Sequence, residues 1–176
     1  KKADCPLNEL DNIMAEFYTS HFREEGVESF YVGKTKALPE ISREIRHGIE
    51  AELFEKWKVG DISIVELQKV SKLLLERMGE IRTEIEARIM EAKEEYEACD
   101  QDRLDNVSEW SRLGILQRMV GAGARRYADH QGILTDYYTA KTMLVALEFA
   151  KQLAAKVFVE LGKMDADILS FSQKIN

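Results

Sequence analysis

Proline is confined to positions 6 and 39 of this 176-residue chain, so residues 40–176 contain none. Proline in a helix interior costs about 3 kcal/mol, because it lacks an N–H and its ring clashes with the preceding turn. The long proline-free stretch is instead rich in alanine, glutamate, lysine, leucine, arginine and isoleucine, the mixture typical of long helices. The sequence therefore predicts an all-α protein.

A seam of apolar residues at steps of three and four begins at Ser63 and continues for roughly fifty residues. The first part of the seam repeats about every 11 residues, and helices with such a repeat wind around each other nearly straight. This part consists of Leu67, Val70, Leu74, Met78, Ile81, Ile85, Ile89 and Ala92. Beyond this point the seam thins to Tyr96, Cys99, Leu104, Val107 and Trp110.

A second, mostly heptad-like seam occupies the C-terminal part of the chain. It consists of Ile133, Tyr137, Ala140, Leu144, Leu147, Ala150, Ala154, Val157, Leu161, Met164, Ile168 and Phe171. Gly114, Gly121 and Gly123 lie between the two seams and mark a turn. We therefore predict a long antiparallel helical hairpin with arms of about 49 residues, roughly 73 Å each, and a tip near residues 113–125.

Two shorter helices are predicted before the hairpin. The first covers Leu7 to about Arg23 with amphipathic spacing, and Gly26 ends it. Residues 27–38 are predicted to be a connector. The second helix starts with Pro39 in its first turn and continues to Val59, with Gly60 as its C-cap.

The hairpin itself starts at a capping box formed by Ser63 and Glu66. Its second arm has an additional apolar face between Met143 and Leu161, made of Val145, Phe149, Leu153 and Phe158. A two-stranded coil buries only one stripe, so we expect the N-terminal helices, residues 1–62, to form a bundle at the base of the hairpin, residues 63–176.

Charge and cysteine content limit the classes of partner and compartment. The net charge of −7 argues against nucleic-acid binding, and no run approaches the roughly 20 apolar residues of a membrane helix. Cys5 and Cys99 are far apart in sequence, which favours a reducing compartment, so we expect a cytoplasmic protein. The chain lacks an initiator methionine and ends within its helical pattern, and we expect it to be part of a longer protein.

No motif predicts an enzyme, a metal site or a cofactor. Glu44 and His47 form one Glu-x-x-His unit, whereas a di-iron bundle needs two such units and two further glutamates. Asp100, Asp102 and Asp105 lack the glycine and the terminal glutamate of a calcium loop. The glycine-rich segment at residues 121–126 lacks the features of a phosphate-binding loop and is interpreted as the bend at the tip.

The tip is the candidate site for partner contact, because apolar residues cluster there: Trp110, Leu113, Ile115, Leu116, Met119 and Val120. If exposed, they form the kind of patch that marks a contact surface. The alternative is that the tip folds into a short helix and buries them against Tyr127.

The run from Ile45 to Leu67, with Glu50-Ala51-Glu52-Leu53-Phe54-Glu55-Lys56-Trp57 at its centre, resembles the helical region of large bacterial tubulin-like proteins. Leu147-Glu148-Phe149-Ala150 is similar to the same region. The resemblance implies a non-catalytic appendage of a GTPase, and it transfers no nucleotide-binding residue.

The sequence predicts a non-catalytic structural or interaction module that binds a protein partner or a second copy. Two alternatives are a four-helix-bundle metal or cofactor protein and a membrane-active helical hairpin.

Overall fold

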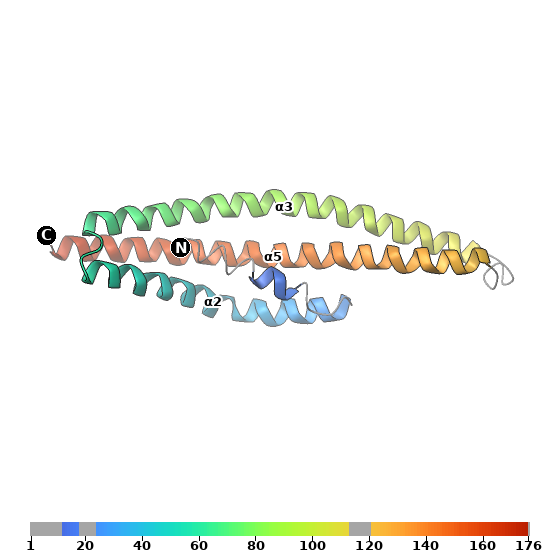
Figure 1. Ribbon diagram of the computed structural model, residues 1–176, viewed down its shortest axis with the longest axis horizontal. Coiled ribbons are helices and arrows are strands. Elements are labelled where there is room, and N and C mark those ends of the chain that lie inside the picture. The colour runs from blue at the N-terminus through green and yellow to red at the C-terminus, as the bar shows by residue number, and fades with distance from the viewer. Residues whose placement is uncertain (1–11, 18–23, 113–120, 176) are drawn as a thin grey trace.

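The computed structural model describes residues 12–17, 24–112 and 121–175 (Figure 1). Its long helices are α2 (Glu24–Lys58), α3 (Ile64–Arg112) and α5 (Gly121–Ile175), and residues 12–17 are also helical. Within these ranges there is no strand, so the predicted all-α class is confirmed.

Helices α3 and α5 run antiparallel along most of their lengths (Figure 1). Near the start of α3, Ser71 donates a hydrogen bond to Asp165, 3.0 Å away near the end of α5. Near the end of α3, Asn106 contacts His130, close to the start of α5. Helix α3 has the predicted length of 49 residues, and α5 is longer than predicted, at 55 residues.

Helix α2 packs along the second half of α5 and runs parallel to it. Glu28 pairs with Lys141 at one end, while the ring of Trp57 lies 5.1 Å from that of Phe171 at the other. Because α2 and α3 have few close backbone approaches, α5 is the central helix and packs against both. Packing of this kind, and not intrinsic propensity, stabilises most helices in proteins.

The predicted connector at residues 27–38 is wrong, because α2 continues through it and through Pro39. Leu38 is 1% exposed, and the aromatic ring of Phe30 lies 4.7 Å from that of Phe17. Burial of such side chains contributes about 1.5–3 kcal/mol each, enough to offset the cost of an interior proline. Figure 1 shows α2 changing direction near its middle, as expected at a proline.

The turn between α2 and α3 has the predicted caps. Gly60 has a φ of 81°, and the N–H groups of Gly60 and Asp61 donate to the carbonyls of Trp57 and Lys56, which is a Schellman motif. The Ser63 N–H donates to the Glu66 carboxylate at 2.7 Å, and the Glu66 N–H donates to the Ser63 hydroxyl at 3.2 Å. Both helix ends at this turn are therefore satisfied by local groups.

The hydrophobic core lies where α2, α3 and α5 run together. The first seam is buried from Leu67 to Ala92, apart from the half-buried Val70. On the additional apolar face of α5, Phe149 and Leu153 are 0% exposed, whereas Val145 and Phe158 are only partly covered. The chain is thus a bundle of long helices whose central helix has a wide buried face.

Candidate functional site

The hairpin extends beyond the described end of α2 as a two-helix segment (Figure 1). The ion pair between Lys141 and Glu28 marks this end of the α2–α5 contact. We call residues 92–112 of α3 and 121–140 of α5 the arm, and the remaining parts of α2, α3 and α5 the base.

A bridge of arginine and carboxylates joins α2 to α5 in the base. Arg46 donates to Glu50 on its own helix at 2.8 Å, and to Glu160 and Asp167 on α5 at 3.1 and 2.7 Å. Burial raises the pKa of Glu160, but hydrogen bonds from Arg46 and Lys163 outweigh it and leave the pKa below its ordinary value. These groups satisfy one another, so the bridge fixes helix register and presents no free catalytic group.

The interior of the arm begins with an aromatic and cationic contact. The hydroxyls of Tyr96 and Tyr137 lie 3.3 Å apart, and the guanidinium of Arg103 lies 4.8 Å from the centre of the Tyr137 ring. Arg103 also donates to the Asp100 carboxylate at 2.7 Å, and this hydrogen bond raises the pKa of Arg103. A stacked, paired guanidinium of this kind is a packing element.

One turn farther along α3, Asn106 pairs with His130 across the arm. The Oδ1 atom of Asn106 accepts a hydrogen bond from Nδ1 of His130 at 2.6 Å, and Asn106 is only 6% exposed. Asn106 begins an Asn-Val-Ser sequon, but its amide lies inside the arm. His130 therefore occupies a seam position.

The residues that face inward on α3 in the arm differ from the predicted seam. Leu104 and Val107, two of the predicted seam residues, are 48% and 44% exposed. Arg103 and Asn106 take the inward positions, because they continue the steps of three and four from Ala92 through Tyr96 and Cys99. Neither side chain has the apolar character by which a seam is recognised.

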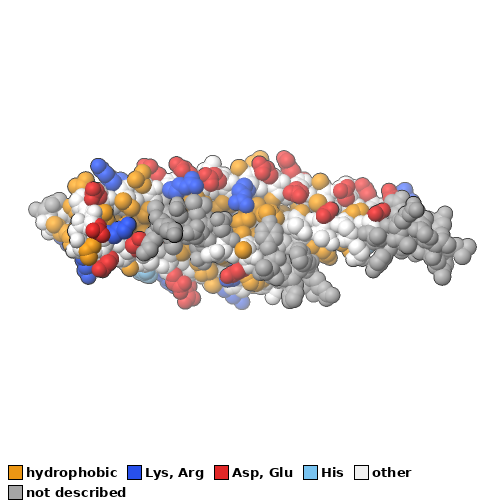
Figure 2. Space-filling model, in the orientation of Figure 1, with side chains coloured by type: hydrophobic (Ala, Val, Ile, Leu, Met, Phe, Trp, Pro, Cys, Tyr) orange, Lys and Arg blue, Asp and Glu red, His pale blue; other side chains and the backbone are white. Residues whose placement is uncertain are grey.

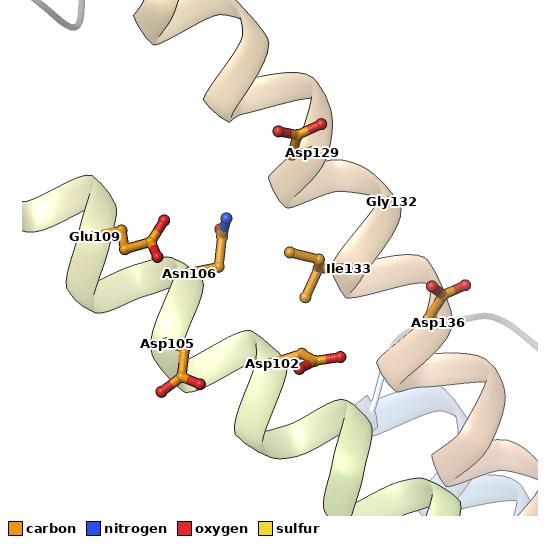
Figure 3. Close-up of a pocket in the computed structure, with 8 residues that line it drawn as sticks. All are labelled: Asp102, Asp105, Asn106, Glu109, Asp129, Gly132, Ile133 and Asp136. Carbon is orange, nitrogen blue, oxygen red and sulfur yellow. The ribbon is translucent and has the colours of Figure 1, made fainter.

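An acidic groove of about 650 Å³ lies between α3 and α5 in the arm (Figure 3). Its lining consists of Asp102, Asp105, Asn106, Glu109, Asp129, Gly132, Ile133 and Asp136. In Figure 3 the carboxylates of Asp102 and Glu109 extend toward α5, whereas that of Asp105 points away from it. The carboxylates do not converge, and no cluster of metal ligands is found in the part of the chain that the structure describes.

The thiol of Cys99 lies at the same level of the arm. Burial raises its pKa, and the charges of Glu95, Asp136 and Asp102 raise it further. The thiolate is the reactive form, so this environment lowers reactivity. Cys99 is thus a small packing residue.

The six residues predicted to contact a partner at the tip mostly lie outside the described residues. Trp110 belongs to α3, but its side chain and residues 113–120 fall in the undescribed part. Gly121 and Gly123, two glycines of the predicted bend, lie in the first turn of α5. Helix α3 ends at Arg112 and α5 begins at Gly121, so the predicted bend at residues 121–126 belongs to a helix.

Compared with known proteins, the chain matches no family model, no curated protein and no solved structure. Among the described helices, none has a stretch long and apolar enough to cross a membrane.

Proposed function

We propose that this chain is a non-catalytic structural and protein-interaction module, in which the base holds the arm and the arm contacts a protein. The observation that carries the proposal is the extension of α3 and α5 beyond the described end of α2 (Figure 1). Twenty residues of α5, 121–140, precede Lys141, which corresponds to about 30 Å of helix.

The contrast between base and arm supports this division of roles. In the base, Phe149, Leu153 and Leu161 on α5 are completely buried. Among the described side chains of the arm, α5 contributes Tyr137 and Ala140 as buried apolar residues, and hydrogen bonds join Tyr96 to Tyr137 and Asn106 to His130. A well-packed base gives a fixed direction to an arm whose outer faces carry charge.

The candidate contact region is the far end of the arm with the tip residues named above. Arg112, which adjoins the tip residues in the sequence, is exposed at the end of α3. Taken with the resemblance to the helical region of tubulin-like proteins, this arrangement favours a non-catalytic appendage that connects such a GTPase to another protein.

Site-specific photo-crosslinking in intact producing cells tests the proposal. A benzoylphenylalanine at Ser108, exposed in the arm, is compared with one at Ser170, exposed near the end of α5. We expect a protein adduct from position 108 after ultraviolet irradiation, and none of the same mass from position 170. Absence of any adduct from the arm, or the same adduct from both positions, contradicts the proposed role.

A further inference from the structure

A pocket of about 530 Å³ lies between the first half of α2 and the middle of α5. Its charged residues are two glutamates. Glu28 is exposed, whereas the lysine that pairs with it, Lys141, is mostly buried, so the carboxylate faces the solvent. The lining consists of Glu28, Tyr31, Val32, Leu144, Val145 and Glu148. This end of the α2–α5 interface is therefore acidic.

A second pocket, of about 340 Å³, lies farther along the same two helices beside Pro39. Three exposed cations, Arg43, Lys156 and Lys163, belong to its lining. Lys163 pairs with Glu160, whereas Arg43 and Lys156 form no ion pair within the part of the chain that the structure describes. This end of the interface is therefore basic.

Both pockets lie on the same side of the α2–α5 pair. They are 11 residues apart on each helix, since Pro39 takes the place of Glu28 on α2 and Ala155 takes that of Leu144 on α5. Eleven residues make three helical turns to within about 20° and a rise of about 16 Å. Because α2 and α5 run parallel, the two pockets follow each other along one surface. We call this side of residues 28–43 and 141–163 the α2–α5 face.

Apolar side chains are also exposed on the α2–α5 face. Val32 and Val159 are 52% and 56% exposed, and Leu144 and Val145 are partly covered. Figure 2 shows hydrophobic side chains at many places on one side of the base, so exposure alone does not identify a contact surface. The charge pattern of the α2–α5 face does, because an acidic end and a basic end make the face complementary to itself.

We infer that the α2–α5 face binds the same face of a second copy of this chain, with the helices of the two copies antiparallel. A two-fold axis perpendicular to the helices, midway between the pockets, places α2 on α2 and α5 on α5. Glu28 then approaches Arg43 of the second copy and Glu148 approaches Lys156, and the symmetry repeats both contacts. A parallel arrangement would bring the two acidic ends together and the two basic ends together, which like-charge repulsion disfavours.

The α2–α5 face has the size expected of a weak dimer interface. Residues 141–163 of α5 span about 33 Å, and two packed helices are about 20 Å wide. The face thus covers about 660 Å² per copy, or about 1,300 Å² in total, at the lower end of the range for specific protein–protein interfaces. Since its ionic contacts are exposed, the dimer should weaken as the salt concentration rises.

The inference gives the base a role beyond holding the arm. In an antiparallel dimer the two arms point in opposite directions, so one dimer presents two contact regions. This consequence rests on the proposed function of the arm, whereas the dimer itself does not.

Sedimentation velocity of the full chain over a range of concentrations, at about 50 mM and about 500 mM sodium chloride, measures the association. We expect a monomer–dimer equilibrium at the lower salt concentration and a dissociation constant at least about tenfold higher at the higher one. A chain that stays monomeric at low salt, or an association insensitive to salt, overturns the inference.

Two charge-reversal variants make the test specific. Variant A carries Glu28→Lys and Glu148→Lys, and variant B carries Arg43→Glu and Lys156→Glu. Each alone places like charges at the ionic contacts, so we expect its dissociation constant to rise at least about tenfold. An equimolar mixture restores opposite charges, and we expect a 1:1 heterodimer. A mixture that remains monomeric, or variants that dimerise like the unaltered chain, contradicts the antiparallel pairing.

A control with Glu44→Lys and Glu86→Lys changes the net charge as variant A does, at exposed positions outside the α2–α5 face, and should dimerise like the unaltered chain. Circular dichroism confirms that all variants are helical.

An apolar test does not depend on charge reversal. Val159→Asp places a charge within the α2–α5 face and should abolish the dimer, whereas Val65→Asp, at a residue of α3 that is 54% exposed, should not. Equal effects of these two substitutions overturn the inference. A protein adduct from Ser108 in the arm would stand whatever the outcome, so failure of the dimer and failure of the proposed function are distinguishable.

Discussion

Replacing Leu153 with alanine tests whether the wide apolar face of α5 is covered as the structure shows. Leu153 is 0% exposed and lies in the core formed by α2, α3 and α5. Leucine-to-alanine changes at such sites cost about 3–5 kcal/mol, the sum of lost transfer energy and an incompletely collapsed cavity. The free energy of unfolding should fall by this amount.

The matched control is Leu169→Ala on the same helix, because Leu169 is 50% exposed. Leucine and alanine have similar helix propensities, so the backbone contribution is nearly the same at both positions. The control variant loses little buried area, and we expect its free energy of unfolding to change by less than about 0.5 kcal/mol.

Urea denaturation followed by circular dichroism at 222 nm measures both variants. With an m-value of about 2 kcal/mol/M, a loss of 3–5 kcal/mol lowers the midpoint by about 1.5–2.5 M. Equal midpoints for the two variants, or a larger effect at Leu169 than at Leu153, would refute the assignment of the buried face.

Three further predictions concern shape, thiol chemistry and capping. Small-angle X-ray scattering should give a longest dimension of at least about 82 Å, which is the length of a 55-residue helix. The radius of gyration should lie well above the roughly 16 Å of a compact 176-residue domain. A radius of gyration near 16 Å excludes the extended hairpin. In a Cys5→Ser background, Cys99 should react with a disulfide reagent more slowly at neutral pH than an unhindered thiol does. Its reaction rate should keep rising above pH 9, because burial and the charge of Glu95 raise the pKa of its thiol. Equal reaction rates in folded and urea-unfolded protein would contradict this. Ser63→Ala should lower the free energy of unfolding by about 1 kcal/mol through loss of the N-cap. The conservative Ser63→Thr variant keeps a capping hydroxyl and should retain most of the stability. An unchanged urea midpoint for the alanine variant would count against the cap.

Much of the base could be predicted from the sequence because its local signals agree with its packing. The spacing from Leu67 to Ala92 has one interpretation as a helix face, and that face is the one buried against α5. Ser63 and Gly60 likewise act through bonds to neighbours within five residues, so their roles depend little on the rest of the fold.

The path of α2 could not be obtained in the same way. Gly26, Gly33 and Pro39 each disfavour a helix interior when judged alone, and together they favour a break. The contacts that outweigh them involve distant residues, such as the rings of Tyr31 and Phe149 at 6.4 Å and the bond from Gln152 to the Tyr31 hydroxyl at 2.5 Å. Only the folded arrangement brings these partners together.

The seam between α3 and α5 changes from apolar to polar residues where α2 no longer covers α5. Where α2 covers α5, a third helix is available to bury apolar side chains, and the seam is apolar. Beyond Lys141 the described arm has two helices, each with one neighbour, and inward positions pass to Arg103, Asn106 and His130. A buried polar pair fixes the register of two helices at a cost in stability. The arm therefore gains a defined alignment from hydrogen bonds, while its stability depends on the base, which is the arrangement expected of an element that presents a surface to a partner.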